Sequence, residues 1–258
     1  MLNMSCKITF MGTGTSQGVP IIGCDCEVCT SADPRDKRLR ASVLFESEGY
    51  RILVDAGPDF RYQMLRASVR HLDAILLTHN HKDHTGGLDD VRAFNWIEKK
   101  AVPIYCEKYV QDSLRMEYSY VFSEDKYPGI PEFDLHTIDE NVFYVGPVKI
   151  TPIRAYHYRL PVLGFRIGDI SYVTDANYIP EEEFEKLKGS KVFIINTVRI
   201  GHHVSHFSLQ EALDVIKRVG APRSYLTHLS HQLPKHSKLL SLLPEGVFPA
   251  QDMLSIEV

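Results

Sequence analysis

Residues 78–87 read Thr78-His79-Asn80-His81-Lys82-Asp83-His84-Thr85-Gly86-Gly87 and place three histidines and one aspartate within six residues. This segment follows the apolar run 74–77, which predicts a buried strand, and α/β folds place their chemistry on loops at strand ends. Neutral imidazole and carboxylate groups are the ligands that borderline divalent metals prefer. His79 and His81 can lean to one side of an extended loop, while Asp83 and His84 can face a second metal. A solvated polar loop with chance histidines is the alternative, but it would not carry the partner residues described below.

The pattern H-x-H-x-D-H resembles the signature of the metallo-β-lactamase superfamily. That resemblance implies an α/β fold, the four-layer αββα sandwich, and a two-metal hydrolytic site whose other ligands sit at later strand ends. His157 follows the strand-like run 148–156, Asp175 ends the run 170–175 and His228 ends the run 224–228. Each of these alone fits an ordinary polar strand terminus, but together they follow the order of the superfamily. By this analogy one metal is held by His79, His81 and His157, the other by Asp83, His84 and His228, and Asp175 bridges both.

A second cluster is the run Cys24-Asp25-Cys26-Glu27-Val28-Cys29, which spaces three thiols as C-x-C-x-x-C. Thiolates at this spacing can share one tetrahedral zinc ion. The fourth ligand is expected to be His231, which lies three residues after His228 and can turn away from the catalytic metals. The alternative is three buried free cysteines and a surface histidine. Cys6 and Cys106 stand in apolar, strand-like surroundings and are expected in the core.

Three motifs together narrow the resemblance to one branch of the superfamily: the glycine-rich run 12–20, the three-cysteine cluster and the final His-x-x-His. They resemble the phosphonate-operon cyclic-phosphate phosphodiesterases, which are relatives of the tRNase Z-like hydrolases. In that branch a structural zinc accompanies the two-metal site. His206-Phe207-Ser208 resembles the His-x-Ser/Thr motif whose histidine reaches the phosphate or the leaving group. His202 and His203 are two other candidates for that role. The alternative is that His206 stands at the entrance of a helix and has no chemical role.

Length and composition place further bounds. The 258 residues, 44% hydrophobic and 24% charged, predict one hydrolase domain over residues 1–258. The net charge of −4 gives no basic excess for general nucleic-acid binding. The absence of any apolar run of ~18 residues predicts no membrane span. Residues 1–7 lack a basic region followed by a long apolar core, so we expect no signal peptide and a cytoplasmic protein. Clustered cysteines in such a chain favour metal over disulfide.

The rest of the chain predicts alternating strands and helices. Residues 42–47 and 50–54 predict a hairpin that ends in Asp55, a residue that orients the metal-binding loop in the proteins resembled. The glycine-rich loop 12–18 is predicted to be a turn, although it could line a substrate phosphate. Residues 122–135 are predicted to be a surface excursion. Helices are expected at 88–99, with an apolar face of Val91, Phe94, Trp96 and Ile97, and at 107–117, 180–187 and 208–219.

These features predict a phosphodiesterase for a small phosphodiester, either cyclic or open. A dinuclear zinc or manganese site, with the ions about 3.5–4 Å apart, would supply a hydroxide. Asp83 would help to steer this nucleophile, and His206 would stabilise charge on the departing oxygen or protonate it. The resemblance also suggests a homodimer. The natural substrate and the choice of metal stay open.

Four rival functions are weighed. A tRNA 3′-processing nuclease carries a long arm between motifs that here lie only 18 positions apart, at His157 and Asp175. A glyoxalase II-type thioesterase needs a C-terminal domain, and 30 residues follow His228. A β-lactamase usually has a cysteine where Asp175 stands. A metal-binding or sensing protein without catalysis is the non-enzyme alternative, and the complete ligand set argues against it.

Overall fold

A computed structural model describes residues 6–125 and 127–258 of the chain. Residues 1–5, on which the expectation of no signal peptide partly rests, lie outside the described residues. Two seven-stranded sheets form the centre of the structure. The first has the order β14-β1-β2-β3-β4-β5-β6, with β1 Cys6–Gly12, β2 Ser42–Ser47, β3 Tyr50–Val54, β4 Ala74–Leu76, β5 Val102–Cys106, β6 Phe133–Thr137 and β14 Ser255–Glu257.

The second sheet is built from the other half of the chain. Its order is β13-β12-β11-β10-β9-β8-β7, with β7 Phe143–Val145, β8 Val148–His157, β9 Leu160–Ile167, β10 Ile170–Val173, β11 Val192–Asn196, β12 Arg223–Thr227 and β13 Val247–Pro249. In each sheet one half is antiparallel and the other half is parallel, as in the parallel pairs β3–β4 and β11–β12. Parallel neighbours end at the same edge of the sheet, so the residues that follow them are brought together.

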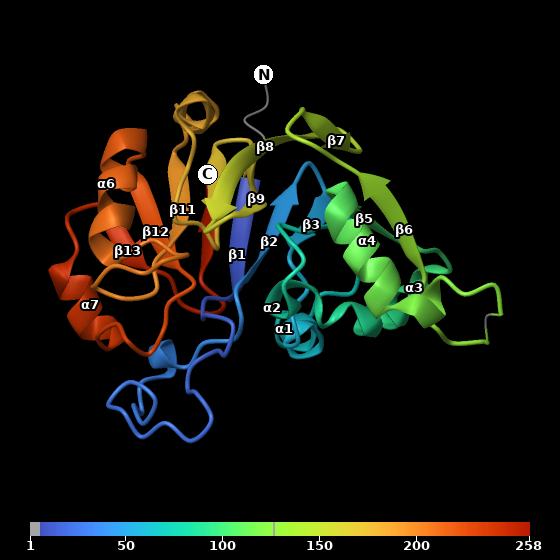
Figure 1. Cartoon of the computed structure of the whole chain (residues 1–258), viewed down its shortest axis with the longest axis horizontal. Helices are drawn as coiled ribbons and strands as arrows, with labels where there is room; N and C mark the ends of the chain where they lie inside the picture. Colours follow the sequence, from blue (N-terminus) through green and yellow to red (C-terminus); the bar gives the residue numbers. More distant parts are fainter. Residues whose placement is uncertain (1–5, 126) are drawn as a thin grey trace.

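Helices cover the outer face of each sheet (Figure 1). The first sheet is covered by α1 Phe60–Arg66, α2 Lys82–Thr85, η2 Leu88–Val91, α3 Arg92–Glu98, α4 Lys108–Glu117 and η3 Ser119–Val121. The second sheet is covered by η4 Glu181–Glu183, α5 Phe184–Leu187, α6 Leu209–Val219 and α7 His236–Leu242. The short helix η1 Pro34–Asp36 lies in the loop between β1 and β2.

Alternation along the strands assigns each side chain to a layer. In β2, Val43 and Phe45 pack between the two sheets, whereas Leu44 packs beneath the helices. In β11, Ile194 faces the opposite sheet and Phe193 faces the helices. These strands carry apolar side chains on both faces, so both faces of each sheet must be shielded from water. The opposite sheet shields one face and the helices shield the other. The α/β four-layer αββα prediction is therefore confirmed.

Local predictions succeed where the sequence carries a strong local signal. The hairpin at 42–47 and 50–54 forms as predicted. Helix α6 begins after Ser208, whose side chain accepts a hydrogen bond from the Glu211 backbone while Glu211 bonds back, and ends at Gly220 in the left-handed conformation. This reciprocal capping satisfies backbone N–H groups that the first helical turn leaves free.

Two predictions need correction. The expected helix at 88–99 is a 3₁₀ turn, η2, followed by the short helix α3. Val91 and Phe94 are buried, but Trp96 and Ile97 are 74% and 69% exposed. Val91 and Phe94 are three residues apart and share the buried face, whereas the helical period turns Trp96 to the opposite side. The segment 122–135 is not only a surface excursion, since its last residues begin β6, which pairs with β5.

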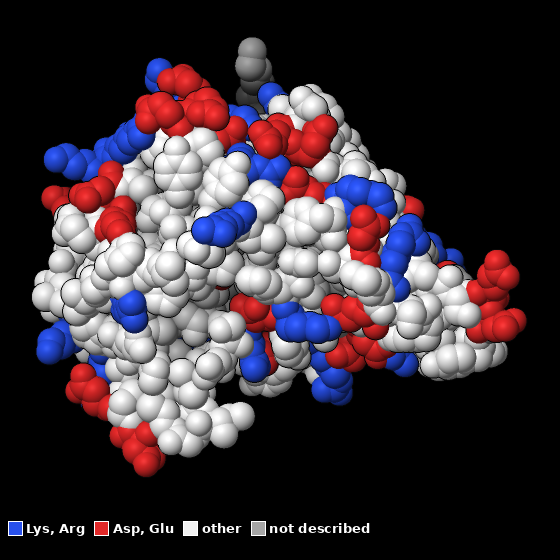
Figure 2. All heavy atoms as spheres, viewed as in Figure 1, with Lys and Arg blue, Asp and Glu red and all other residues white. Residues whose placement is uncertain are grey.

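Charge on the molecular surface is mixed. Lys and Arg side chains are interspersed with Asp and Glu on the face drawn in Figure 2, and they do not merge there into one basic patch. Among residues 6–125 and 127–258, none of the helices combines the length and apolar character that crossing a membrane requires.

Candidate active site

The candidate site lies where strand ends from both sheets meet. Asp55 directly follows β3, and His157 is the last residue of β8. Asp175 is the second residue after β10, and His228 directly follows β12. Asp55, Asp175 and His228 all adopt the left-handed backbone conformation, with φ of 65°, 52° and 54°. Non-glycine residues seldom adopt it, and such strain gathers at functional sites. The chain therefore turns sharply at three strand ends in order to aim three polar side chains at one place.

Four of the predicted ligands converge tightly. The Nε2 atom of His84 lies 3.0 Å from Oδ2 of Asp175 and 3.1 Å from Oδ2 of Asp83. The Nε2 atom of His228 lies 3.1 Å from the same oxygen of Asp175 and 3.8 Å from that of Asp83. All four offer a ligand atom within 4.8 Å of one another. This set contains the second predicted metal site, Asp83, His84 and His228, together with the proposed bridge Asp175.

The other predicted ligands lie beside this group. The ring of His79 is centred 4.6 Å from that of His81 and 5.9 Å from that of His157, and the rings of His81 and His157 are 5.2 Å apart. His157 also forms a compact group with Asp175 and His206, whose ligand atoms lie within 4.8 Å of one another. Asp175 belongs both to this group and to the group with Asp83, His84 and His228. A ligand shared by two metals would have to occupy such a position. The division of ligands between two metals stays a prediction.

Hydrogen bonds fix which nitrogen three of these histidines present. Oδ2 of Asp55 lies 2.6 Å from Nδ1 of His84, and Asp55 also accepts the backbone N–H of Thr78 at 2.9 Å. Oγ1 of Thr78 lies 2.9 Å from Nδ1 of His79. Nδ1 of His157 donates to the Ser205 carbonyl at 2.7 Å. Each ring is therefore held through Nδ1 and turns Nε2 toward the centre, the arrangement typical of metal-binding histidines. The orienting role expected of Asp55 has this geometric basis.

Several of these buried nitrogens have no hydrogen-bond partner within the described chain. They include Nε2 of His79, Nε2 of His84 and both ring nitrogens of His228. A buried polar atom without a partner costs free energy, so native structures rarely keep a cluster of them. Divalent metals would take up the Nε2 lone pairs of His79, His84 and His228, since a neutral imidazole binds through the ring nitrogen that carries no proton. The donor set of imidazoles and carboxylates fits such ions.

Burial and opposite charge set the protonation of the cluster. Burial raises the pKa of Asp175, but His228 and His84 outweigh it and hold that pKa well below the ordinary value. Burial lowers the pKa of His84, but Asp55, Asp175 and Asp83 together raise it well above the usual range. Burial lowers the pKa of His79, so its ring is neutral. The carboxylates thus form a concentrated negative site, and a cation is what stabilises it.

His206 lies closest to this centre among the three histidines considered for the additional role. Its ring is centred 4.5 Å from that of His157, and its Nδ1 lies 3.7 Å from Oδ1 of Asp175. Burial, followed by the charge of His228, lowers its pKa to about 3. His203 lies behind it, with ring centroids 4.9 Å apart, whereas His202 is 76% exposed and faces Glu211. The catalytic role of His206 stays a prediction, and its position favours it over His202.

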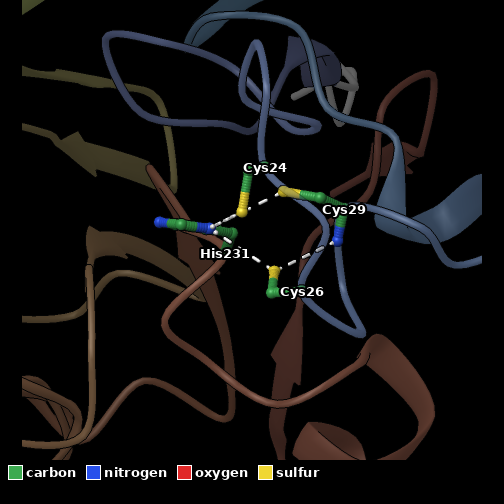
Figure 3. Close-up of side chains that lie close together, drawn as sticks. All are labelled: Cys24, Cys26, Cys29 and His231. Atoms are coloured by element: carbon green, nitrogen blue, oxygen red, sulfur yellow. Dashed lines mark hydrogen bonds between the residues drawn. The ribbon is translucent and has the colours of Figure 1, made fainter.

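The three cysteines and His231 form a second, separate cluster. Their side chains point toward one another from two distant segments (Figure 3). The Sγ atoms of Cys24, Cys26 and Cys29 lie 3.2, 3.5 and 3.6 Å from Nδ1 of His231. The backbone N–H of Cys29 donates to Cys26 and, ahead of the other causes, lowers the pKa of that thiol to about 6. A C₃H donor set with a readily formed thiolate fits a structural zinc.

The structure also adds residues that the motifs did not single out. Ser205 matters through its carbonyl, which orients His157, and Thr78 orients His79. Gln232 lines a pocket beside His206 and His228. Backbone contacts of this kind leave no pattern in a sequence. Cys6 and Cys106, in contrast, are buried in the core as expected.

Comparison with known families agrees with this geometry. The family described as "Beta-lactamase superfamily domain" matches residues 50–229, which contain every predicted ligand of the dinuclear site. The chain belongs to the β-lactamase superfamily and has the metallo-β-lactamase fold. It belongs to the metallo-β-lactamase hydrolase family and carries candidate metal-binding residues.

Individual relatives narrow the position of the chain within the superfamily. A solved structure of a diphosphatase from the PhnP family is 36% identical, with a TM-score of 0.93 over 99% of this chain and 98% of that one. A ribonuclease Z of Mycobacterium sp. (strain KMS) is 23% identical over 86% of this chain and 83% of its own. An octanoyltransferase of Porphyromonas gingivalis is 44% identical over 96% of this chain but only 51% of its own length. The chain thus spans about half of that curated relative. The resemblance to the branch of PhnP and ribonuclease Z is confirmed.

Proposed function

We propose that this protein is a dinuclear metal-dependent phosphodiesterase that hydrolyses a small, cyclic phosphodiester. One observation carries the proposal. Unpartnered Nε2 atoms of buried histidines and the carboxylates of Asp83 and Asp175 converge at the strand ends. Two divalent ions, zinc or manganese, would bind there and supply Lewis acidity and an activated water near neutral pH.

The residues of the chain divide the remaining work. His79, His81 and His157 would hold one ion, Asp83, His84 and His228 would hold the other, and Asp175 would serve both. Asp55 keeps His84 oriented through the 2.6 Å contact to Nδ1. Asp83 would help to steer the attacking water. His206 would hydrogen-bond the phosphoryl or departing oxygen, and such positioned groups contribute typically ~10²–10⁴-fold in rate.

A small substrate is favoured over tRNA by the path of the chain between His157 and Asp175. That segment forms β9 and β10, which pair with their neighbours along their whole length and are joined by a tight turn at Gly168. No arm for RNA leaves the sheet there. The net charge of −4 also supports a substrate with little need for a basic surface. We extend the proposal to a cytoplasmic homodimer without general nucleic-acid binding.

A second candidate comes from the relative named octanoyltransferase. That name belongs to a protein about twice as long as the matched region, so its activity need not reside in that region. Hydrolysis of an octanoyl thioester is nevertheless the activity to compare directly.

The deciding experiment measures hydrolysis by the purified, metal-loaded chain. We expect turnover of bis-p-nitrophenyl phosphate and little turnover of octanoyl thioesters or a tRNA precursor. Asp175→Ala should be inactive, while His136→Ala, which changes a surface histidine paired with Asp134, should match the wild type. Failure to hydrolyse any of the three substrates with metal bound would support a metal-binding protein instead.

Metal content tests the cofactor proposal separately. Seven ligands fit a dinuclear site and four fit the cysteine site, so protein purified without chelator should approach about three ions per chain. Elemental analysis that gives a single ion in a saturated preparation would overturn the two-site assignment.

A further inference from the structure

His228 is held differently from other histidines of the catalytic cluster. Three of those histidines make a hydrogen bond through Nδ1, whereas Nδ1 of His228 has no partner among the described residues. The backbone of His228 is unusual as well, since its φ of 54° lies in the left-handed region. A conformation of this kind persists only where neighbouring contacts hold it. The direction of this side chain therefore depends on its packing and on what fixes the chain on either side.

Backbone hydrogen bonds fix the chain on both sides of His228. On the C-terminal side, the N–H of Leu229 donates to the Thr13 carbonyl at 2.8 Å. On the N-terminal side, the Leu226 carbonyl accepts the N–H of Ala250 at 2.9 Å. Thr13 follows β1 and Ala250 follows β13, so two segments that are far apart in the sequence hold the same short stretch of chain.

A single buried guanidinium joins these two segments. Nη1 of Arg38 donates to the Thr13 hydroxyl at 2.8 Å and to the Ala250 carbonyl at 2.6 Å. Nη2 of Arg38 lies 3.3 Å from Nδ1 of His236. The Thr13 hydroxyl in turn donates to Oδ1 of Asp252 at 2.7 Å. Arg38, Thr13 and His236 are all buried, so water does not compete for these hydrogen bonds.

Arg38 keeps its charge in this environment. Burial lowers its pKa to about 10, and the carboxylates of Asp252 and Asp36 oppose that effect, so the guanidinium is protonated near neutral pH. Hydrogen bonds from a charged donor are stronger than neutral ones. The planar fork of arginine also presents several N–H groups at fixed angles, which the compact ammonium of lysine cannot reproduce. The junction is therefore specific for arginine.

We propose that Arg38 is a positioning residue for His228, because it clamps Thr13 and Ala250 and, through them, the backbone on both sides of that histidine. The inference rests on the proposed function, in which His228 is a ligand of a catalytic metal. Within the described chain, the Arg38 side chain makes no hydrogen bond to any of the seven predicted ligands, so its effect passes through the backbone.

Hydrogen exchange in the metal-free protein tests the clamp itself. Arg38→Lys keeps the charge and loses the fork. Thr13→Val keeps the carbonyl that Leu229 uses and removes the hydroxyl that Arg38 and Asp252 share, and it keeps the test open if Arg38→Lys folds poorly. In each variant, exchange of the Leu229 N–H should rise on the order of tenfold relative to the amides of β4, as expected when a hydrogen bond from a charged donor is lost.

Arg154→Lys is the matched control. Arg154 is also buried, and it donates to Glu107 and Glu140. Its replacement should lower the melting temperature without changing the exchange of Leu229 relative to β4. A uniform rise in exchange across β4 and β12 in Arg38→Lys and Thr13→Val would mean general destabilisation and would overturn the proposal.

Cobalt titration tests the consequence for the metal ligand. In Arg38→Lys and Thr13→Val, the affinity for one catalytic cobalt ion should fall by about 10–100-fold, as for other groups that orient a ligand from behind. The absorption of thiolate-bound cobalt should stay, because none of the cysteines is changed. Wild-type affinity in a variant whose Leu229 exchanges faster would refute the positioning role.

These measurements also separate the inference from the proposed function. A wild type that takes up cobalt only at the cysteines would refute the proposed dinuclear site, and with it the role of His228 that the inference needs. Unchanged exchange of Leu229 in both variants would refute the clamp alone and leave the proposed function standing.

Discussion

The two clusters of metal-ligand type in this molecule are held in opposite ways. The histidine–aspartate centre stands on strand ends of two paired sheets, and Asp55, Thr78 and the Ser205 carbonyl fix its imidazoles from behind. The cysteine cluster stands on an irregular segment between β1 and η1 and meets the rest of the chain through His231, 202 residues after Cys29. The first cluster is pre-organised by the sheets, and the second joins two segments that are far apart in the sequence and outside regular secondary structure.

The two clusters also differ in how deeply their residues are buried. His79, His84, Asp175 and His228 are almost completely buried, next to the large cores. Around the cysteines only Val19, Val28 and Cys29 are buried, with Ile21 and the other two cysteines partly covered. A core this small cannot order a loop by itself. We therefore expect metal in the first cluster to serve chemistry, and metal in the second to serve local folding.

Among the variants compared here, the largest loss of turnover should come from changing His206, which faces the catalytic centre and is not one of the seven predicted metal ligands. His206→Ala should keep both catalytic metals and lose ~10²–10⁴-fold in turnover of phosphodiesters, as expected for a positioned donor. Rates and metal content are measured on the same preparation. His202→Ala is the matched control, because that exposed ring faces Glu211 and should cost little. Near-wild-type rates in His206→Ala would move the role to His203.

An intermediate effect should follow from disturbing the support behind the ligands. Asp55→Asn keeps the size of the side chain but turns an amide toward Nδ1 of His84, which should weaken metal affinity or activity by about 10–100-fold. Asp73→Asn changes an equivalent aspartate–histidine contact, at 2.9 Å from His71, far from the site. The metal affinity of each variant is measured by titration, and the two values are compared. Equal affinities would mean that the fold orients His84 without Asp55, and the contrast between the clusters would weaken.

The sequence predicted the parts of this architecture that depend on local chemistry. The segment from His79 to His84 indicated a metal site because few other roles use that spacing, and the two short apolar runs of β2 and β3, close together in the sequence, indicated a hairpin. Short helices were harder: α1 and α7 carry weak periodicity, and the expected apolar face of α3 included Trp96, which lies on its exposed side. The length of such elements is set by tertiary packing and not by propensity.

Within the site, ligands were easier to predict than their supports. Imidazoles and carboxylates are recognisable as donor types, whereas the Ser205 carbonyl acts through the backbone, which every residue has. Gln17 and Gln232 are a related case: both are exposed polar residues, and only the fold shows that they line the same pocket. The glycine-rich loop was the only sequence signal that pointed there.

The smallest effect on chemistry, and the sharpest test of the comparison, should come from Cys26→Ser. Removing one of four ligands should release the structural zinc and lower the melting temperature, which falls by roughly 2–4 °C for each kcal/mol lost in a domain of this size. Turnover of bis-p-nitrophenyl phosphate per folded molecule should stay within about tenfold, because the catalytic ligands stand on the sheets. Hydrogen exchange should rise in residues 13–33 and stay low in β4 and β12. Cys106→Ala is the control, since this fully buried thiol lies in the core of the first sheet and its loss should lower the melting temperature without loss of zinc. If Cys26→Ser removes activity as completely as His206→Ala does, the two clusters are one cooperative unit and the contrast drawn between them is wrong.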